Sequence, residues 1–297
     1  FAIISHPDAG KTTLTEQILL ETGAINLAGQ VRAKASSKRT ISDFIKIEKE
    51  RGISVSTSAM SIDYNGYWLN LVDTPGHADF SEDTYRTLTA VDFVIMVIDG
   101  AKGVESQTKK LFEICRLRDL PIITFCNKMD RESREVVDII DEIQESLALE
   151  VSPINYPIGK GNDFIGCYEL NDGNIELLIK KNKNIKNQIK FINSKSNNQL
   201  SSIINKEKWE QEFENLNLIK SLTAEFNFNN FQDGVLSPIF FGSAIYSLGV
   251  KRLLKSVIEY GPFPKPRQSK KRLIRPEEKN VTGFIFKVQA NMDFRHR

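Results

Sequence analysis

Short apolar runs alternate along roughly the first half of the chain with stretches in which apolar side chains recur at helical spacing. The runs predict buried strands and the spaced stretches predict helices, an alternation that is typical of a parallel sheet covered by helices on both faces. The predicted strands are residues 1–4, 68–73, 91–99 and 121–126, and the predicted helices are residues 12–20, 108–118 and 136–147. We therefore expect an α/β fold with a mostly parallel sheet.

The pattern changes after about residue 160, where asparagine becomes frequent. Asn occurs 14 times in residues 171–230 but only 4 times in residues 1–150, and such a polar stretch is typical of a solvated, weakly constrained region. Two strand-like runs and one stretch of helical spacing argue against wholesale disorder. The runs are residues 175–179 and 189–192, and the helical spacing covers residues 209–222. We expect an inserted subdomain at about residues 160–236.

The end of the chain predicts a domain boundary. Core-like composition returns with a strand at residues 238–241 and a helix at residues 250–259. The following Gly- and Pro-rich stretch cannot continue a helix, so it indicates a linker. The predicted organisation is a main domain at residues 1–262, a linker at 263–280 and the first strand of a truncated second domain at 281–297. Because the chain opens inside an apolar run and stops shortly after a strand-like one, we expect a fragment of a longer protein.

Composition excludes several classes of protein. Lys and Arg number 40 and Asp and Glu number 38, so the net charge of +2 gives no overall basic field for nucleic acid. The longest apolar run, residues 93–98, is far shorter than the roughly 20 residues that span a bilayer. The three cysteines are far apart and fit neither a disulfide framework nor a zinc site. We expect a cytoplasmic monomer that binds neither DNA nor membrane.

Residues 5–12, Ser-His-Pro-Asp-Ala-Gly-Lys-Thr, lie between a predicted strand and a predicted helix and match the phosphate-loop pattern, with Ser5 where Gly is usual. Gly10 lets the backbone close on phosphates, while the helix presents its positive N-terminal end. Lys11 would reach the β- and γ-phosphates, and the Thr12 hydroxyl would ligate Mg²⁺. The alternative is an ordinary strand-to-helix turn, and the loop alone does not separate a GTPase from an ATPase or a kinase.

Three later motifs follow predicted strands and favour GTP. Asp73-Thr74-Pro75-Gly76 offers a carboxylate for Mg²⁺ and a backbone N–H for the γ-phosphate. In Asn127-Lys128-Met129-Asp130, the Asp130 carboxylate accepts from both guanine donors, the Lys128 stem covers the base and Asn127 ties this loop to the phosphate loop. Gly242-Ser243-Ala244 would offer an N–H to the guanine carbonyl. Each motif alone is weak, but their order along the chain indicates a guanine-nucleotide site.

These residues resemble the translational GTPases. The phosphate loop that runs from Asp8 to Thr13 has the style of elongation factor G, and His77 directly follows Gly76. Residues 50–54, Glu-Arg-Gly-Ile-Ser, resemble a first switch, with Ser54 where elongation factors have Thr. Ser54, residues 80–92 and residues 282–293 are similar to the bacterial peptide-chain release factor 3 family, although Phe294 stands where Pro is expected.

The resemblance implies a P-loop GTPase domain at residues 1–262 and the start of a β-barrel after it. It implies GTP/GDP and Mg²⁺ as cofactors, and the bacterial ribosome, through its RNA, and a class-one peptide-chain release factor as partners. The implied function is ribosome-stimulated GTP hydrolysis in termination, which promotes dissociation of the class-one factor after peptide release. The alternatives are an elongation-factor-G-like translocase and a GTP-dependent ribosome-binding module with little hydrolysis of its own.

The expected site residues fall into three sets. The catalytic set is His77, Asp8 and Lys11, and the metal set is Thr12, Ser54 and Asp73. The nucleotide-binding set is Ser5, His6, Pro7, Asp8, Ala9, Gly10, Lys11, Thr12, Thr13, Asp73, Thr74, Pro75, Gly76, His77, Asn127, Lys128, Asp130, Ser243 and Ala244. Two alternatives stay open within these sets, since His6 and His77 can each hold a structural hydrogen bond instead of a catalytic role.

Overall fold

The computed structural model describes residues 1–25, 58–74, 81–179, 188–193 and 206–286. The predicted first switch with Ser54 lies outside these residues, and so do Pro75, Gly76 and His77.

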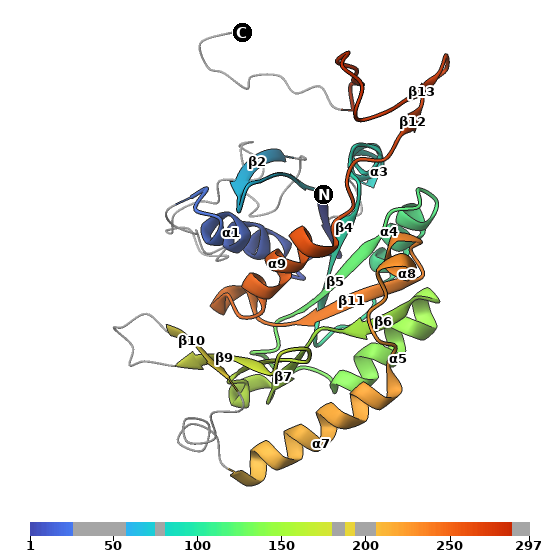
Figure 1. The fold of residues 1–297 in the computed structure, drawn as a ribbon. Helices are drawn as coiled ribbons and strands as arrows, with labels where there is room; N and C mark the ends of the chain where they lie inside the picture. The colour runs from blue at the N-terminus through green and yellow to red at the C-terminus, as the bar shows by residue number, and fades with distance from the viewer. Residues whose placement is uncertain (26–57, 75–80, 180–187, 194–205, 287–297) are drawn as a thin grey trace.

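A sheet of seven strands forms the centre of the molecule (Figure 1), in the order β2-β3-β1-β4-β5-β11-β6. All neighbouring strands run parallel except β2 and β3, which are antiparallel. The strands are β1 (Ala2–Ser5), β2 (Ser58–Tyr64), β3 (Tyr67–Asp73), β4 (Val94–Asp99), β5 (Ile122–Asn127), β6 (Glu150–Pro153) and β11 (Leu236–Phe241). The prediction of a mostly parallel α/β sheet is confirmed.

Helices cover both faces of this sheet, because each central strand is apolar on both sides. Along β1, Ile3 faces α1 (Lys11–Glu21) and α9 (Val250–Tyr260), while Ala2 and Ile4 face α4 (Ser106–Arg116) and α5 (Val136–Leu147). Two buried apolar cores result, one on each face of the sheet. Shorter helical elements are α3 (Ser81–Thr87), η2 (Leu88–Ala90), η3 (Gly161–Asp163) and η4 (Ala244–Tyr246).

The β2–β3 hairpin was not part of the predicted pattern. Its two-residue loop is Asn65-Gly66, with φ angles of 52° and 80°. Both angles are positive, as the tight hairpin turns that match the twist of the strands require. An Asn-Gly pair between two alternating runs was the sequence signal for this hairpin. Trp68, just after the turn, is 74% exposed.

A second, antiparallel sheet fills the chain between β6 and β11, in the order β10-β9-β8-β7. Its strands are β7 (Asn155–Ile158), β8 (Gly166–Glu169), β9 (Asn174–Ile179) and β10 (Gln188–Asn193), followed by α7 (Lys206–Leu222) and α8 (Phe228–Gln232). The sheet begins at Asn155, and its apolar residues join the core on the α4–α5 face. Helix α7 packs on it through Trp209, whose ring centroid lies 5.9 Å from that of Tyr168.

The stretch predicted to be a linker contains a short hairpin, β12 (Arg267–Gln268) with β13 (Leu273–Ile274). Arg267 fastens it to the main domain by donating to the carbonyls of Thr89 at 2.6 Å and Val91 at 3.1 Å. Residues 281–286 form no strand, and residues 287–297, the rest of the stretch predicted to begin a second domain, lie outside the described residues. Among the described helices, none has the length and apolar character needed to cross a membrane.

Candidate functional site

The predicted motifs come together at one edge of the central sheet. They follow the carboxyl ends of β1, β3, β5 and β11, which are all parallel to one another. In α/β sheets of this kind, ligands bind in the crevice outside the carboxyl ends of the strands.

The phosphate loop joins β1 to α1 in a conformation that only glycine can hold at residue 10. Gly10 has a φ of 95°, and its carbonyl accepts the Leu14 N–H at 2.9 Å to begin the helix. A Cβ built on Gly10 would lie 2.3 Å from the Asn127 amide nitrogen. Ser5 and Ala9 are buried in the same loop. The glycine is thus required both by the backbone angle and by the close approach of Asn127, the first residue of Asn127-Lys128-Met129-Asp130, which we call the guanine motif.

Lys11 and Asp73 form a buried ion pair between the start of α1 and the end of β3. The Lys11 Nζ lies 2.5 Å from Asp73 Oδ1, and the two side chains are 5% and 1% exposed. The other carboxylate oxygen, Asp73 Oδ2, is buried and has no partner among the described residues. An unpartnered buried carboxylate oxygen beside a phosphate loop fits a Mg²⁺ ion that arrives with a nucleotide. Thr74 fixes this strand end by donating to the Ile3 carbonyl at 2.7 Å.

Asp73→Asn is expected to raise the Mg²⁺ concentration at the midpoint of GTP binding by roughly 10–100-fold. This is the usual loss of metal affinity when a residue that supports the metal from its outer coordination shell is changed. A titration of Mg²⁺ at constant GTP, followed by fluorescence of a labelled nucleotide, measures this. Asp63→Asn is the matched control, because Asp63 is exposed on the adjacent strand β2. An unchanged Mg²⁺ midpoint in Asp73→Asn would remove Asp73 from the metal set.

Asn127 connects three loops of the site. Its side-chain amide donates to the Ala9 carbonyl at 2.8 Å, and its Oδ1 accepts the Ala244 N–H at 2.8 Å. The Ser243 hydroxyl donates to Asp130 Oδ1 at 2.5 Å. The residues predicted for the guanine base are therefore in direct contact with one another, although 113 positions separate Asp130 from Ser243.

Lys128 crosses from the guanine motif to the phosphate loop. Its ammonium donates to the Asp8 carbonyl and to Asp99 Oδ2, the latter at 2.6 Å. Asp8 and Lys128 both have left-handed backbones, with φ angles of 63° and 69°. Such strained backbone in non-glycine residues concentrates at functional sites.

Asp99 was missed by the sequence analysis, although it ends the buried strand β4 at the same sheet edge. Burial raises the pKa of its carboxyl, but hydrogen bonds from Lys128 and from the Ala101 N–H outweigh burial, and the pKa lies below its usual range. The Asp99-Gly100 pair that closes an apolar strand was the available signal, since the sheet edge lies where such strands end. Asp99 holds the ammonium of Lys128 in place.

His6 is buried inside the phosphate loop, and both of its ring nitrogens are engaged. Nδ1 contacts Glu105 Oε2, and Nε2 lies 3.3 Å from the Asp99 backbone nitrogen, whose N–H it accepts. Burial lowers the pKa of the imidazole, and the Glu105 carboxylate opposes that shift. A neutral ring that donates from Nδ1 and accepts at Nε2 matches these contacts. The geometry favours the structural alternative for His6, and Glu105 is a second residue that the sequence analysis missed.

The remaining predicted residues divide into two groups. Pro7 lies in the phosphate loop, and Thr12 and Thr13 lie in the first turn of α1, beside Lys11. Ser54, Pro75, Gly76 and His77 lie outside the described residues, so their roles stay predictions.

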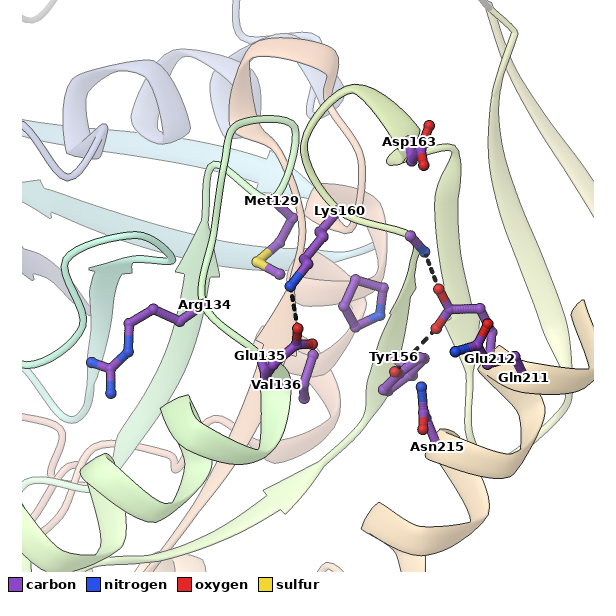
Figure 2. Close-up of a pocket in the computed structure, with 12 residues that line it drawn as sticks. Met129, Arg134, Glu135, Val136, Tyr156, Lys160, Asp163, Gln211, Glu212 and Asn215 are labelled. Atoms are coloured by element: carbon purple, nitrogen blue, oxygen red, sulfur yellow. Dashed lines mark hydrogen bonds and ion pairs between the residues drawn. The ribbon is translucent and has the colours of Figure 1, made fainter. Parts of the chain in front are cut away.

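A separate pocket of about 330 Å³ lies between the start of α5, the loop after β7 and α7 (Figure 2). Glu212 of α7 accepts from the Tyr156 hydroxyl at 3.2 Å and from the Gly159 N–H at 3.1 Å. On the other side of the pocket, Lys160 pairs with Glu135. Met129 of the guanine motif lines the same pocket. The Gly161 N–H, in the loop after β7, donates to the Met129 carbonyl at 3.0 Å, so this loop contacts the motif Asn127-Lys128-Met129-Asp130 directly.

Comparisons with known proteins agree with this geometry. Residues 1–262 match the family described as the Elongation factor Tu GTP binding domain. A solved structure from Thermus thermophilus is similar over 88% of this chain, with a TM-score of 0.67 and 21% sequence identity. This chain spans 40% of the length of that protein. At this identity the structural likeness supports the fold.

Proposed function

Because the chain belongs to the family of translational GTPases that share the elongation factor Tu GTP-binding domain, we propose that it is a ribosome-dependent GTP hydrolase of translation termination. In this role it promotes the dissociation of class-one release factors after peptide release. GTP and GDP are its nucleotides, and Mg²⁺ is the cofactor that binds with them.

The observation that carries the proposal for GTP is the convergence of Asp130, Ser243 and Asn127. Guanine carries two adjacent donors, N1–H and the exocyclic amine, and one carboxylate accepts both. Asp130 is the carboxylate at this position, and the Ser243 hydroxyl donates to it at 2.5 Å. The proposed role of Ala244 is to present its N–H to the guanine carbonyl, and in the structure this N–H donates to Asn127 Oδ1. Adenine lacks the pair of donors, so this arrangement favours GTP over ATP.

The phosphate end of the site supports hydrolysis. The Lys11 ammonium and the backbone N–H groups of the phosphate loop bind and partly neutralise the β- and γ-phosphates. Mg²⁺ held by Thr12, Ser54 and Asp73 would supply further positive charge to those phosphates. The proposed role of His77 is to orient the attacking water, and the proposed role of Gly76 is to sense the γ-phosphate. GTP then orders the loops that hold Ser54 and Gly76, and hydrolysis releases them.

Termination is favoured over translocation by Ser54 and by residues 80–92, the parts that resemble the release factor 3 family. The first half of the latter stretch forms helix α3, where Tyr85 is 48% exposed and lies under the Arg118 guanidinium at 4.2 Å. The translocase alternative keeps the same chemistry and changes only the state of the ribosome that the protein acts on.

A turnover assay with the full-length protein tests the proposal. We expect slow hydrolysis of GTP by the protein alone and stimulation by bacterial ribosomes on the order of 10³-fold or more, as activators in trans give other GTPases. With GTP, the protein should also speed the release of a labelled class-one factor from ribosomes that have released their peptide.

The alternatives give different results in this assay. A translocase would move transfer RNA and messenger RNA on ribosomes before termination and leave the class-one factor bound. A binding module would occupy ribosomes with GTP and show little stimulated hydrolysis. Either result would contradict the termination role.

A further inference from the structure

The loop that follows β11, residues 242–248, is held at both ends by side chains of the inserted sheet. This loop carries Ser243 and Ala244, the residues proposed to read the guanine base. Its two ends are already joined to each other, since Ser243 and Leu248 exchange backbone hydrogen bonds of 3.1 and 3.0 Å. Residues just outside the loop, Phe241 and Gly249, are the points where the inserted sheet makes its contacts.

At the first end, Asn155 of β7 takes the place of a neighbouring strand. Strand β6 pairs with β11 only as far as Ile239, which lies opposite Pro153. Beyond that point the Asn155 side chain accepts from the Phe241 N–H at 2.7 Å and donates to the Phe241 carbonyl at 2.9 Å. Asn155 is 1% exposed, so both bonds are shielded from water. The Phe241 carbonyl also accepts from the Cys167 thiol of β8 at 3.2 Å, so loss of the Asn155 side chain would leave the buried Phe241 N–H as the unpaired group.

At the second end, Glu176 of β9 caps helix α9. Its Oε2 accepts the Gly249 N–H at 2.7 Å, at the N-terminus of the helix. Gly249 has a φ of 77°, and a Cβ there would lie 2.8 Å from the Phe241 carbonyl oxygen, so the two ends of the loop are in close contact. Glu176 is 4% exposed, and its Oε1 is buried without a partner among the described residues.

The inserted subdomain also supports the other guanine loop. The Gly161 N–H donates to the Met129 carbonyl at 3.0 Å, next to Asp130. Both loops proposed to contact the base therefore rest on the same inserted unit, and the anchoring atoms are backbone groups whose position sets that of the loops.

We propose that Asn155 and Glu176 are positioning residues for the guanine site, through which the inserted subdomain sets how fast the nucleotide dissociates. The proposal rests on the proposed guanine-nucleotide function and adds the residues that hold its recognition loop. Neither residue belongs to the set proposed to contact the base, so each would act through Phe241 or Gly249.

The carboxyl of Glu176 adds a pH dependence to this geometry. Burial raises its pKa to about 7, Glu169 of β8 and Glu21 of α1 add to the rise, and the Gly249 N–H and Lys251 of α9 oppose it. A carboxylate accepts a stronger hydrogen bond from an N–H than a neutral carboxyl does. The hydrogen bond from the Gly249 N–H to Glu176 should therefore become stronger as the pH rises from 6 to 8.

The experiment is a stopped-flow chase of fluorescently labelled GDP from the full-length protein at pH 6 and pH 8. At pH 8 we expect Glu176→Ala and Asn155→Ala each to raise the dissociation rate about tenfold, the scale of one lost buried hydrogen bond to backbone. Glu176→Gln keeps an oxygen that can accept from Gly249, so it should restore the rate to within about threefold of the original protein. The original protein should release GDP about threefold faster at pH 6 than at pH 8, whereas Glu176→Gln should show a clearly smaller difference between the two pH values.

Ile175→Val is the matched control, because Ile175 is buried beside Glu176 on β9 and belongs to the apolar core. It loosens the inserted sheet without changing a bond to the loop, so its GDP dissociation should stay at the original rate. Burial also raises the pKa of Glu169 to about 7. Glu169 is present in both the original protein and Glu176→Gln, so the difference between their pH slopes isolates Glu176.

The possible failures are distinguishable. If the original protein binds no GDP, the proposed guanine function fails. If it binds GDP but Glu176→Ala and Asn155→Ala behave like Ile175→Val, the positioning role is overturned while the guanine function stands. If Glu176→Ala does not fold, an unchanged pH slope in Glu176→Gln overturns the role of the Glu176 carboxyl.

Discussion

Asp130→Asn is expected to bind GTP roughly a hundredfold more weakly and to bind xanthosine triphosphate more tightly than the original protein does. The substitution replaces one acceptor oxygen with a donor amide, which then faces a donor of guanine. Xanthine carries a carbonyl in place of the exocyclic amine and regains the lost pairing. Because Ser243 donates to Asp130 Oδ1, the oxygen of the new asparagine can keep that bond and the loop can stay in place. Competition of both nucleotides against labelled GDP measures the switch.

Ser243→Ala is the matched control for this switch. It removes the same hydrogen bond from the other side and leaves the carboxylate free to accept from guanine. We expect Ser243→Ala to lower the affinities for GTP and for xanthosine triphosphate by a similar factor and to leave the ratio of the two affinities unchanged. Unchanged GTP affinity in Asp130→Asn would remove Asp130 from the base site.

His77→Ala is expected to abolish most of the ribosome-stimulated hydrolysis, a loss on the order of 10³-fold or more if the ribosome acts as an activator in trans. Lys11, Mg²⁺ and backbone donors position the phosphates, but the attacking water still needs a group to orient it. His77 is the best placed by sequence, directly after the γ-phosphate-sensing Gly76. GTP binding should stay nearly intact, since the side chain is expected to touch water and not the nucleotide. Single-turnover hydrolysis on ribosomes, with a separate measurement of GTP affinity, checks both parts.

A second histidine substitution controls for this one. His296→Ala changes a residue of the segment Arg295-His296-Arg297, far in sequence from every nucleotide-binding motif, and should leave stimulated hydrolysis unchanged. Full stimulation in His77→Ala would move the catalytic role to another residue, with Asp8 the next candidate. Loss of GTP affinity in His77→Ala would instead mean that the side chain shapes the pocket.

The sequence predicted the nucleotide motifs because each of them is local. A phosphate loop needs a strand, a Gly-Lys-Thr turn and a helix within about a dozen residues, and this pattern is visible without any tertiary contact. The same is true of Asn127-Lys128-Met129-Asp130 at the end of β5. The strand ends then meet because parallel strands place all their carboxyl ends at one edge.

The supports of the site were not predictable in this way. Asn155 bonds to a residue 86 positions away, and Glu176 to one 73 positions away. Neither belongs to a motif, and a single Asn or Glu in a short strand carries no local sign of its partner. Short strands such as β6 and β8 were missed for a related reason, since four residues give too few positions to establish a period.

The two tryptophans lie in different parts of the structure, so intrinsic fluorescence can follow each part separately. Trp68 is 74% exposed just after the hairpin turn, whereas Trp209 is the half-buried residue that seats α7 against Tyr168. The chain contains no other tryptophan, so each indole signals from a different structural unit. Quenching by a water-soluble agent such as iodide would act first on Trp68, and the emission that survives would follow the seating of α7. Separation of α7 from the inserted sheet would then be visible as a red shift of that residual emission, without any label.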